Sequence, residues 1–205
     1  MSIDWGQELK GWQTGIGAFL GFGAIIVGAL FNAHLNRKRD TRLRSDEMIA
    51  VASALYGEIV IVRQAVARMA NAVAHRFVEH GVGNIRDEPF DRHFIEQITL
   101  PPLRLYPSLA AKVGMLPSQI ALEIVRFYAR VEEAQAWLPR LREDAERPFT
   151  YSVCYVLDPA IDAITGVLPA LTAIEDLAGI EERIGTPDIK KAIDAQDFER
   201  MRNEP

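Results

Sequence analysis

The residues of this chain that are best suited to chemistry lie close together near its middle. Asp91, His93 and Glu96 place an imidazole between two carboxylates. On a helix His93 and Glu96 would share one face, and helical bundles ligate metals from such pairs. A di-metal bundle also needs matching carboxylates from other helices, and no second Glu-x-x-His segment is present. We therefore expect no metal and no cofactor, and interpret the segment as a polar loop whose three residues are the metal candidates.

The rest of the sequence favours a protein that is not an enzyme. The single cysteine, Cys154, lies in an apolar aromatic stretch without a basic neighbour to lower its pKa, which is typical of a small buried residue. The sequence contains no Walker loop, no Gly-x-Gly-x-x-Gly opening a helix, no Gly-x-Ser-x-Gly and no Cys-x-x-Cys. A lone cysteine forms no internal disulfide, so nothing indicates an oxidising compartment.

The composition is that of a folded protein. The chain has 205 residues, of which 49% are hydrophobic and 25% charged, and this excludes disorder and collagen-like repeats. The net charge of −5 excludes a generally basic protein that coats nucleic acid.

Charge is absent from one long segment near the start. The 26 residues from Gly11 to Asn36 include no Asp, Glu, Lys or Arg. As a helix they span about 39 Å, enough to cross a hydrocarbon core of about 30 Å. We predict a transmembrane helix over Trp12–Leu35. A buried hairpin helix and a cleaved signal peptide are the alternatives; a signal peptide needs a positive start and a small-x-small cleavage site, neither of which is evident here.

The residues behind the apolar segment indicate its orientation. Five basic residues against Asp40 give residues 37–44 a net charge of +4: Arg37, Lys38, Arg39, Arg42 and Arg44. Such a cluster stays on the cytoplasmic side and attracts anionic lipid headgroups. The sequence thus predicts a single-pass inner-membrane protein with its amino terminus outside. The alternative, a nucleic-acid patch, is disfavoured because topology already explains the cluster.

Small residues line one face of the predicted membrane helix. Gly17, Gly21, Ala24 and Gly28 follow one another at steps of four, three and four. Small-x-x-x-small pairs let two membrane helices approach closely. We expect self-association or packing against a partner membrane helix through this face.

The remaining sequence predicts an antiparallel helical bundle. Three segments carry apolar residues at alternating steps of four and three, which is a helical seam. The first runs from Met48 to Val73, the second from Ile120 to Leu141 and the third from Leu157 to Ile174. Asp158-Pro159 is the expected start of the third helix, Pro169 should kink it, and Gly179 should end it. A final polar helix over Pro187–Met201 is expected to fray. The first seam can alternatively form a parallel coiled coil between copies.

These observations predict an all-α chain in four parts. Residues 1–36 hold the amino-terminal segment and membrane helix, 37–47 the basic juxtamembrane segment, 48–180 the cytoplasmic bundle and 181–205 an acidic helix or tail. The membrane helix is expected to run directly into the first helix of the bundle, because the charged residues between them contain no helix breaker.

The plan of the chain resembles a loose group of uncharacterised bacterial single-pass membrane proteins. These proteins often carry a Leu-Leu-Pro turn and a Phe-Tyr pair where this chain has Leu116-Pro117 and Phe127-Tyr128; Met115 replaces the first Leu. The resemblance covers roughly residues 10–140 and implies only structural roles, a helix start and a packed aromatic pair.

The leading hypothesis is a non-enzymatic, membrane-anchored interaction or scaffolding module. Its expected partners are the lipid bilayer, a second copy or a partner membrane helix, and a cytoplasmic protein, but no nucleic acid. One alternative is a subunit of a membrane transport or secretion complex. Another is a membrane-anchored metal enzyme that uses Asp91, His93 and Glu96.

Overall fold

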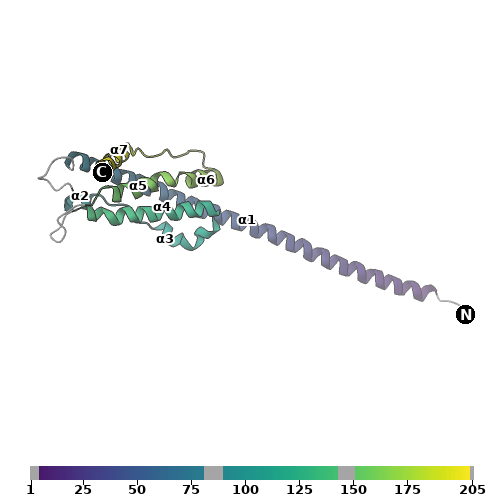
Figure 1. Ribbon diagram of the computed structural model, residues 1–205. Helices are drawn as coiled ribbons and strands as arrows, with labels where there is room; N and C mark the ends of the chain where they lie inside the picture. The colour runs from purple at the N-terminus through teal and green to yellow at the C-terminus, as the bar shows by residue number, and fades with distance from the viewer. Residues whose placement is uncertain (1–4, 81–89, 143–150, 204–205) are drawn as a thin grey trace. The chain divides into compact units, whose positions relative to one another are not determined.

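The structure, a computed structural model, describes residues 5–80, 90–142 and 151–203, and for residues 5–21, 24 and 80 it gives only the backbone. Every regular element in these ranges is a helix, which confirms the all-α fold (Figure 1). The chain divides into two compact units, residues 1–47 and residues 48–205. The division falls between Glu47 and Met48, where the sequence analysis begins the bundle.

The first helix, α1 (Trp5–His80), is continuous over 76 residues. It ends at His80. Its residues up to Glu47 belong to the first unit and those from Met48 to the second. In the second unit the predicted seam is buried against other helices of the same chain: Ala52, Leu55, Ile59, Val62, Val66, Met69 and Val73. The seam therefore packs within the chain.

The second unit is completed by shorter helices. In chain order they are α2 (Arg92–Gln97), α3 (Leu105–Leu109), the 3₁₀ helix η1 (Ala110–Met115), α4 (Ser118–Trp137), the 3₁₀ helix η2 (Leu138–Leu141), α5 (Cys154–Gly166), α6 (Leu168–Ala178) and α7 (Lys190–Asn203). The predicted seam of α4 and η2 is buried along its whole length, from Ile120 to Leu141. One hydrophobic core thus joins α1 to α4, α5, α6 and α7.

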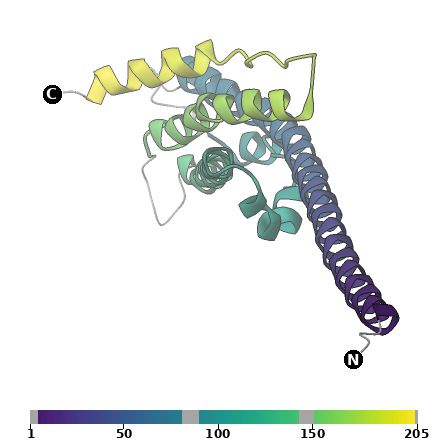
Figure 2. The ribbon, with the colours of Figure 1, turned by 90° about the vertical axis from the view of Figure 1, so that its right-hand side faces the viewer.

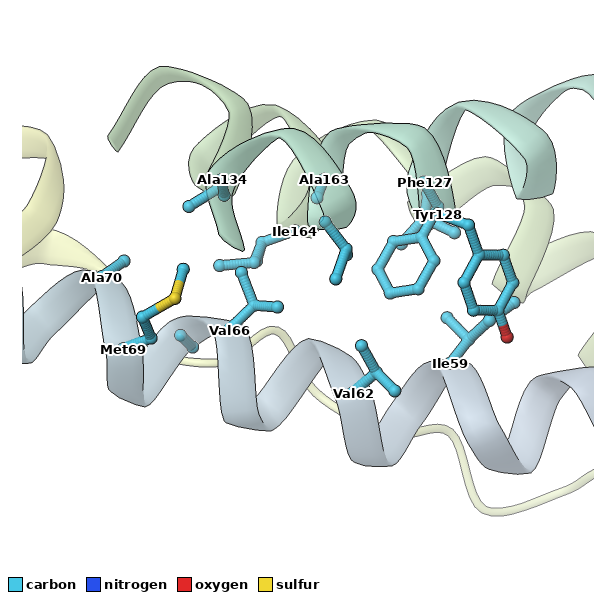
Figure 3. Close-up of a cluster of buried hydrophobic side chains, with 14 of the residues drawn as sticks. Ile59, Val62, Val66, Met69, Ala70, Phe127, Tyr128, Ala134, Ala163 and Ile164 are labelled. Carbon is cyan, nitrogen blue, oxygen red and sulfur yellow. The ribbon is translucent and has the colours of Figure 1, made fainter. Parts of the chain in front are cut away.

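The helices of the bundle run in two directions. Figure 3 shows Ile59 of α1 beside Tyr128 of α4, and further along both helices Ala70 near Ala134, so α1 and α4 run the same way. The described chain between α1 and α4 runs back along α1, from Asp91 beside Arg76 to Leu105 beside Glu58, which allows this parallel pairing. Helices α5 and α6 run the opposite way, because Arg63 bonds to Ile164 while Tyr56, earlier on α1, bonds to the later Glu175.

A break separates α5 from α6, as the proline there predicts. Pro169 has no N–H to donate to the preceding turn, and the helix is interrupted at Val167. Helix α6 then ends at Gly179, the expected terminus, whose φ of 66° is left-handed. Glycine adopts this conformation without the steric cost that a Cβ brings.

Two features differ from the sequence analysis. Helix α5 begins at Cys154, so Pro159 lies inside it rather than at its start, because burial of Val156 and Leu157 outweighs the backbone bond lost at the proline. Helix α7 is not a frayed tail. It is packed against α5 and the end of α1, with Ala192 and Ala195 buried (Figure 2).

Two helical stretches are long and apolar enough to cross a membrane by length and composition. They are Ile25–Glu79, near the amino terminus, and Cys154–Ala178. The second comprises α5 and α6, and Leu157, Ile164 and Ile174 of this stretch are fully buried in the bundle. Core helices of soluble domains have the same composition, so its hydrophobicity is explained by packing.

Candidate functional site

The three metal candidates do not converge on one point. Asp91 caps α2, its Oδ1 accepting the N–H of Phe94 at 2.7 Å. His93 Nε2 lies 2.8 Å from the Gln97 amide, and Glu96 accepts from Arg92 Nε at 2.6 Å. In the part of the chain that the structure describes, no group of three His, Cys, Asp or Glu side chains is arranged to hold a metal ion. The segment is a short capped helix rather than the expected loop.

A buried carboxylate is the most elaborate polar feature of the bundle. Glu58 of α1 accepts the backbone N–H groups of Arg104, Leu105 and Tyr106 at 2.7–2.9 Å, and the hydroxyl of Tyr128 at 2.8 Å. The three N–H groups are the unpaired donors at the start of α3, which no side chain of its own caps. Glu58 therefore fixes α3 to α1 and joins both to α4.

These contacts lower the pKa of Glu58 and raise that of Tyr128. Burial by itself would raise the pKa of Glu58, but the donors from Leu105, Arg104, Tyr106 and Tyr128 outweigh it, and the net pKa is lowered. Burial, followed by the bond to Glu58, raises the pKa of Tyr128 well above its ordinary value. Glu58 is therefore ionised and Tyr128 neutral at neutral pH. The arrangement is a stable hydrogen-bonded anchor and has no group poised to exchange protons near pH 7.

An arginine lies in the centre of the core. Arg63 is 1% exposed, and its Nε donates to the carbonyl of Ile164 at 2.9 Å, shortly before the break between α5 and α6. Burial lowers the pKa of Arg63, while the charge of Glu175 opposes the change. Glu175 also accepts from the Tyr56 hydroxyl at 2.8 Å. Arg63 Nη2 has no hydrogen-bond partner in the described structure, and the charge is balanced at longer range by Glu175.

An open groove of about 650 Å³ lies between α4 and the junction of α5 with α6. Arg130, on its wall, is paired with Glu133 at 2.6 Å and with Asp162 at 3.7 Å. The hydroxyl of Thr165 donates to the Ile161 carbonyl of its own helix at 2.8 Å. The groove thus has neither an activated nucleophile nor an acid–base pair among the residues that line it, and Arg130, Glu133 and Asp162 satisfy one another.

Cys154 is at the start of α5, partly buried under α7. Its Sγ lies 3.9 Å from the Gln196 carbonyl. Burial raises the pKa of the Cys154 thiol, and the hydrogen bond with Ser152 only partly counteracts this. A thiol with a raised pKa is a poor nucleophile at neutral pH, which agrees with the structural role expected from the sequence.

The apolar segment of α1 is exposed in the first unit. Seven large side chains between Phe22 and Leu35 are exposed, including Phe22 at 65% and Ile25 at 70%: Phe22, Ile25, Ile26, Val27, Leu30, Phe31 and Leu35. At 3.6 residues per turn these positions surround the helix, so no face of it is polar over this length. The basic residues Arg37, Lys38, Arg39, Arg42 and Arg44 follow on the same helix and are exposed as well.

The predicted small-residue face lies on α1. The surroundings of Gly17, Gly21 and Ala24 fall outside the described side chains. A Cβ added at Gly28 would meet nothing within 4 Å. Packing of this face against another helix therefore stays a prediction.

Glu58 and Arg63 were missed by the sequence analysis, although a signal for them exists. Arg63 stands four residues after Ile59 and three before Val66, which puts it on the buried side of the seam. Glu58 directly precedes Ile59. A charged residue within a seam predicts a buried polar partner, but the partner carbonyl and N–H groups belong to distant segments that carry no sequence signal.

Comparisons with models of protein families, with characterised proteins and with solved structures find no match to this chain. The resemblance to a loose group of single-pass membrane proteins is not tested by them.

Proposed function

We propose that the chain is a single-pass protein of the inner membrane, without enzymatic activity, whose helical bundle is an interaction or scaffolding module in the cytoplasm. The observation that carries the proposal is the exposure of seven large apolar side chains between Phe22 and Leu35. Burying each such side chain is worth about 1.5–3 kcal/mol, so leaving all seven in water costs on the order of 10–20 kcal/mol. A hydrocarbon environment removes that cost.

The flanking charges support one orientation. The basic residues between Arg37 and Arg44 carry five positive charges against the single negative charge of Asp40. Translocation of such a cluster is disfavoured, so residues from Arg37 onward stay in the cytoplasm. The same charges attract anionic headgroups.

The net charge of the bundle is negative. The whole chain carries −5, residues 1–36 carry −1 and residues 37–44 carry +4, so residues 45–205 carry −8. An anionic lipid surface repels such a body. Its outer faces therefore stay available to protein partners near the membrane, where confinement raises the effective concentration of partners.

Membrane anchoring is tested by alkaline extraction of membranes from cells that produce the full chain. The protein should stay in the membrane pellet, and a matched variant with Val27→Asp and Phe31→Asp should move to the supernatant. Reporters fused after residue 205 test the orientation: a fluorescent protein should fluoresce and a phosphatase should be inactive. Release of the unaltered chain by alkali, or an active carboxyl-terminal phosphatase, would overturn the proposal.

A further inference from the structure

Helix α7 is held on the bundle by few large apolar contacts. Its buried apolar residues are Ile189, just before the helix, and the small Ala192 and Ala195. Two polar side chains, Gln196 and Glu199, are carried into the same interface. Segments with few buried apolar contacts open at lower free energy than the rest of a domain. Helix α7 is therefore more easily displaced than α4, α5 or α6, each of which buries several large apolar side chains.

Polar groups under α7 are incompletely satisfied. Asn71 Nδ2 donates to the Asp188 carbonyl at 2.7 Å, but Asn71 Oδ1 is buried without a hydrogen-bond partner in the described structure. Glu199 Oε2 is instead satisfied within α7 itself, by an ion pair with Arg202 at 2.8 Å. Buried polar atoms without hydrogen bonds cost free energy in the native state. The packing of α7 on its own chain thus leaves a buried polar atom unsatisfied, which lowers its stability.

The main polar clasp of α7 depends on one residue of α5. Asp158 Oδ1 accepts both from the Gln196 amide and from Arg200 Nη2, the latter at 3.1 Å. Both Asp158 and Arg200 are about half exposed, so solvent can replace their contact. These hydrogen bonds fix the position of α7 on α5 but contribute little free energy to its binding.

Beneath α7 the bundle presents an apolar surface shaped for this helix. Phe77 of α1 is buried there, and it meets Phe198 of α7 edge to face with ring centroids 6.2 Å apart. Removing α7 would uncover Phe77. The surface therefore needs an occupant, and the occupant it fits is a helix with the sequence of α7.

The connection to α7 is long enough to reach a neighbouring molecule. Residues 180–189 form no regular element and are mostly exposed, as the extended segment before the yellow helix in Figure 2 shows. Ten extended residues can span about 33 Å. The start of this segment is fastened by Ile180, which packs against the core, and by Arg183, which pairs with Asp176 at 2.9 Å and with the buried Glu175 at 3.8 Å.

We propose that α7 exchanges between two copies of the chain, each copy's α7 occupying the α1–α5 surface of the other. The inference rests on the proposed membrane anchoring, because confinement to one bilayer raises the concentration of the second copy that competes with the chain's own α7. Exchange of an identical element is an inexpensive route to a dimer, since every contact in the swapped form already exists in the single chain.

The single native cysteine makes the exchange directly measurable. Cys154 Sγ lies 3.9 Å from the backbone of Gln196 on the seated α7. Two chains with different tags are co-produced: the unaltered chain, and a chain with Cys154→Ser and Gln196→Cys. Oxidation of the intact membranes can then join Cys154 of the first chain to position 196 of the second only if α7 is seated in the other copy.

A matched control places the thiol one residue further along, by Asp197→Cys in the Cys154→Ser chain, because Asp197 is exposed. We expect at least about fivefold more two-tag disulfide dimer with Gln196→Cys than with Asp197→Cys. A third chain with Gln196→Cys and the native Cys154 should also form an intrachain disulfide, which shows that the substitution leaves α7 able to seat.

Two results would overturn the exchange. One is a two-tag dimer no stronger than the Asp197→Cys control while the intrachain disulfide forms. The other is the absence of both disulfides, which would mean that α7 does not sit on Cys154 at all. The membrane proposal is tested independently of the disulfides. If it is wrong, alkaline extraction releases the chain, whichever disulfides form.

Discussion

The hydroxyl of Tyr128 donates a 2.8 Å hydrogen bond to the carboxylate of Glu58, a residue 70 positions earlier in the chain. Both side chains are buried, at 1% and 8% exposure respectively. The contact joins α1 to α4 at the point where α3 is also attached, so three elements share one anionic group.

Removing the hydroxyl should weaken the bundle. A hydrogen bond to a buried charge is worth about 1.5–3 kcal/mol, and we expect Tyr128→Phe to lower the free energy of unfolding by that amount. The ring stays, so its stacking on Tyr106, with centroids 3.9 Å apart, is kept. Urea unfolding of the detergent-solubilised protein followed by circular dichroism measures the change. A loss no larger than that of an exposed control, Tyr155→Phe, would contradict the assignment.

The stability of the bundle should fall at acid pH through Glu58. Because the folded-state pKa of Glu58 is lowered below its ordinary 4.5, its contribution is complete above the unfolded value and is lost as pH falls through the folded value. Glu58→Gln removes this dependence. We therefore expect the stability difference between the native chain and Glu58→Gln to be constant between pH 6 and 8, roughly, and to shrink below about pH 4.5. A difference that grows on acidification would show the opposite shift.

The buried Arg63 should be more costly to truncate than to replace by an apolar side chain. Both substitutions remove the charge that faces Glu175 and the donor to the Ile164 carbonyl, but Arg63→Ala also leaves a void, and we expect it to cost about 3–5 kcal/mol. Arg63→Met fills most of that volume, so it should cost about 2 kcal/mol less than Arg63→Ala. Thermal unfolding of the two variants provides the comparison. Equal losses would mean that the guanidinium bond to the Ile164 carbonyl, rather than packing, sets the stability.

A glycine on α1 should be replaceable with a gain in stability. Gly57 lies in a regular helical turn, is exposed, and a Cβ there would meet nothing within 4 Å. Gly57→Ala should stabilise the bundle by about 1 kcal/mol, because alanine loses less backbone entropy in a helix. Gly179→Ala is the contrasting variant and should destabilise the bundle, because a φ of 66° is strained for a residue with a side chain. Melting temperatures that change in the same direction in both variants would refute this distinction.

The small residues of the predicted membrane helix give a test of self-association. Gly17→Ile with Gly21→Ile should reduce chemically crosslinked oligomer, because bulky side chains keep the two helices apart. Phe19→Ile with Phe22→Ile introduces the same residue away from that face and is the control. Crosslinking that both pairs leave unchanged would remove this face from the mechanism.

The apolar pattern was sufficient to predict the long helical segments of the bundle, those of α1, α4 and the α5–α6 pair, and their buried faces. Alternating steps of three and four placed Ile59, Phe127 and Ile164 in the core, where the structure has them. The break near Pro169 and the left-handed Gly179 followed from backbone chemistry. These features depend on neighbouring residues, so a local pattern contains them.

What the pattern could not supply are relationships between distant segments. The parallel course of α1 and α4 follows from the path of the chain between them, which has no periodicity. The anchoring of α3 by Glu58 depends on backbone N–H groups that every sequence provides. The packing of α7 was missed because its buried face consists of alanines, whose small side chains give little periodic contrast.

The opposite course of α5 and α6 bears on how the protein is made. Arg63 meets its carbonyl partner 101 residues later in the chain. At about 5–20 residues per second, a ribosome needs roughly 5–20 s to synthesise that interval. During this time the part of α1 that packs against α5 and α6 has been synthesised but is not yet covered by them. A nascent chain whose first segment is already inserted in the bilayer would spend that delay at the membrane, away from other unfinished chains in the cytosol with which it could aggregate.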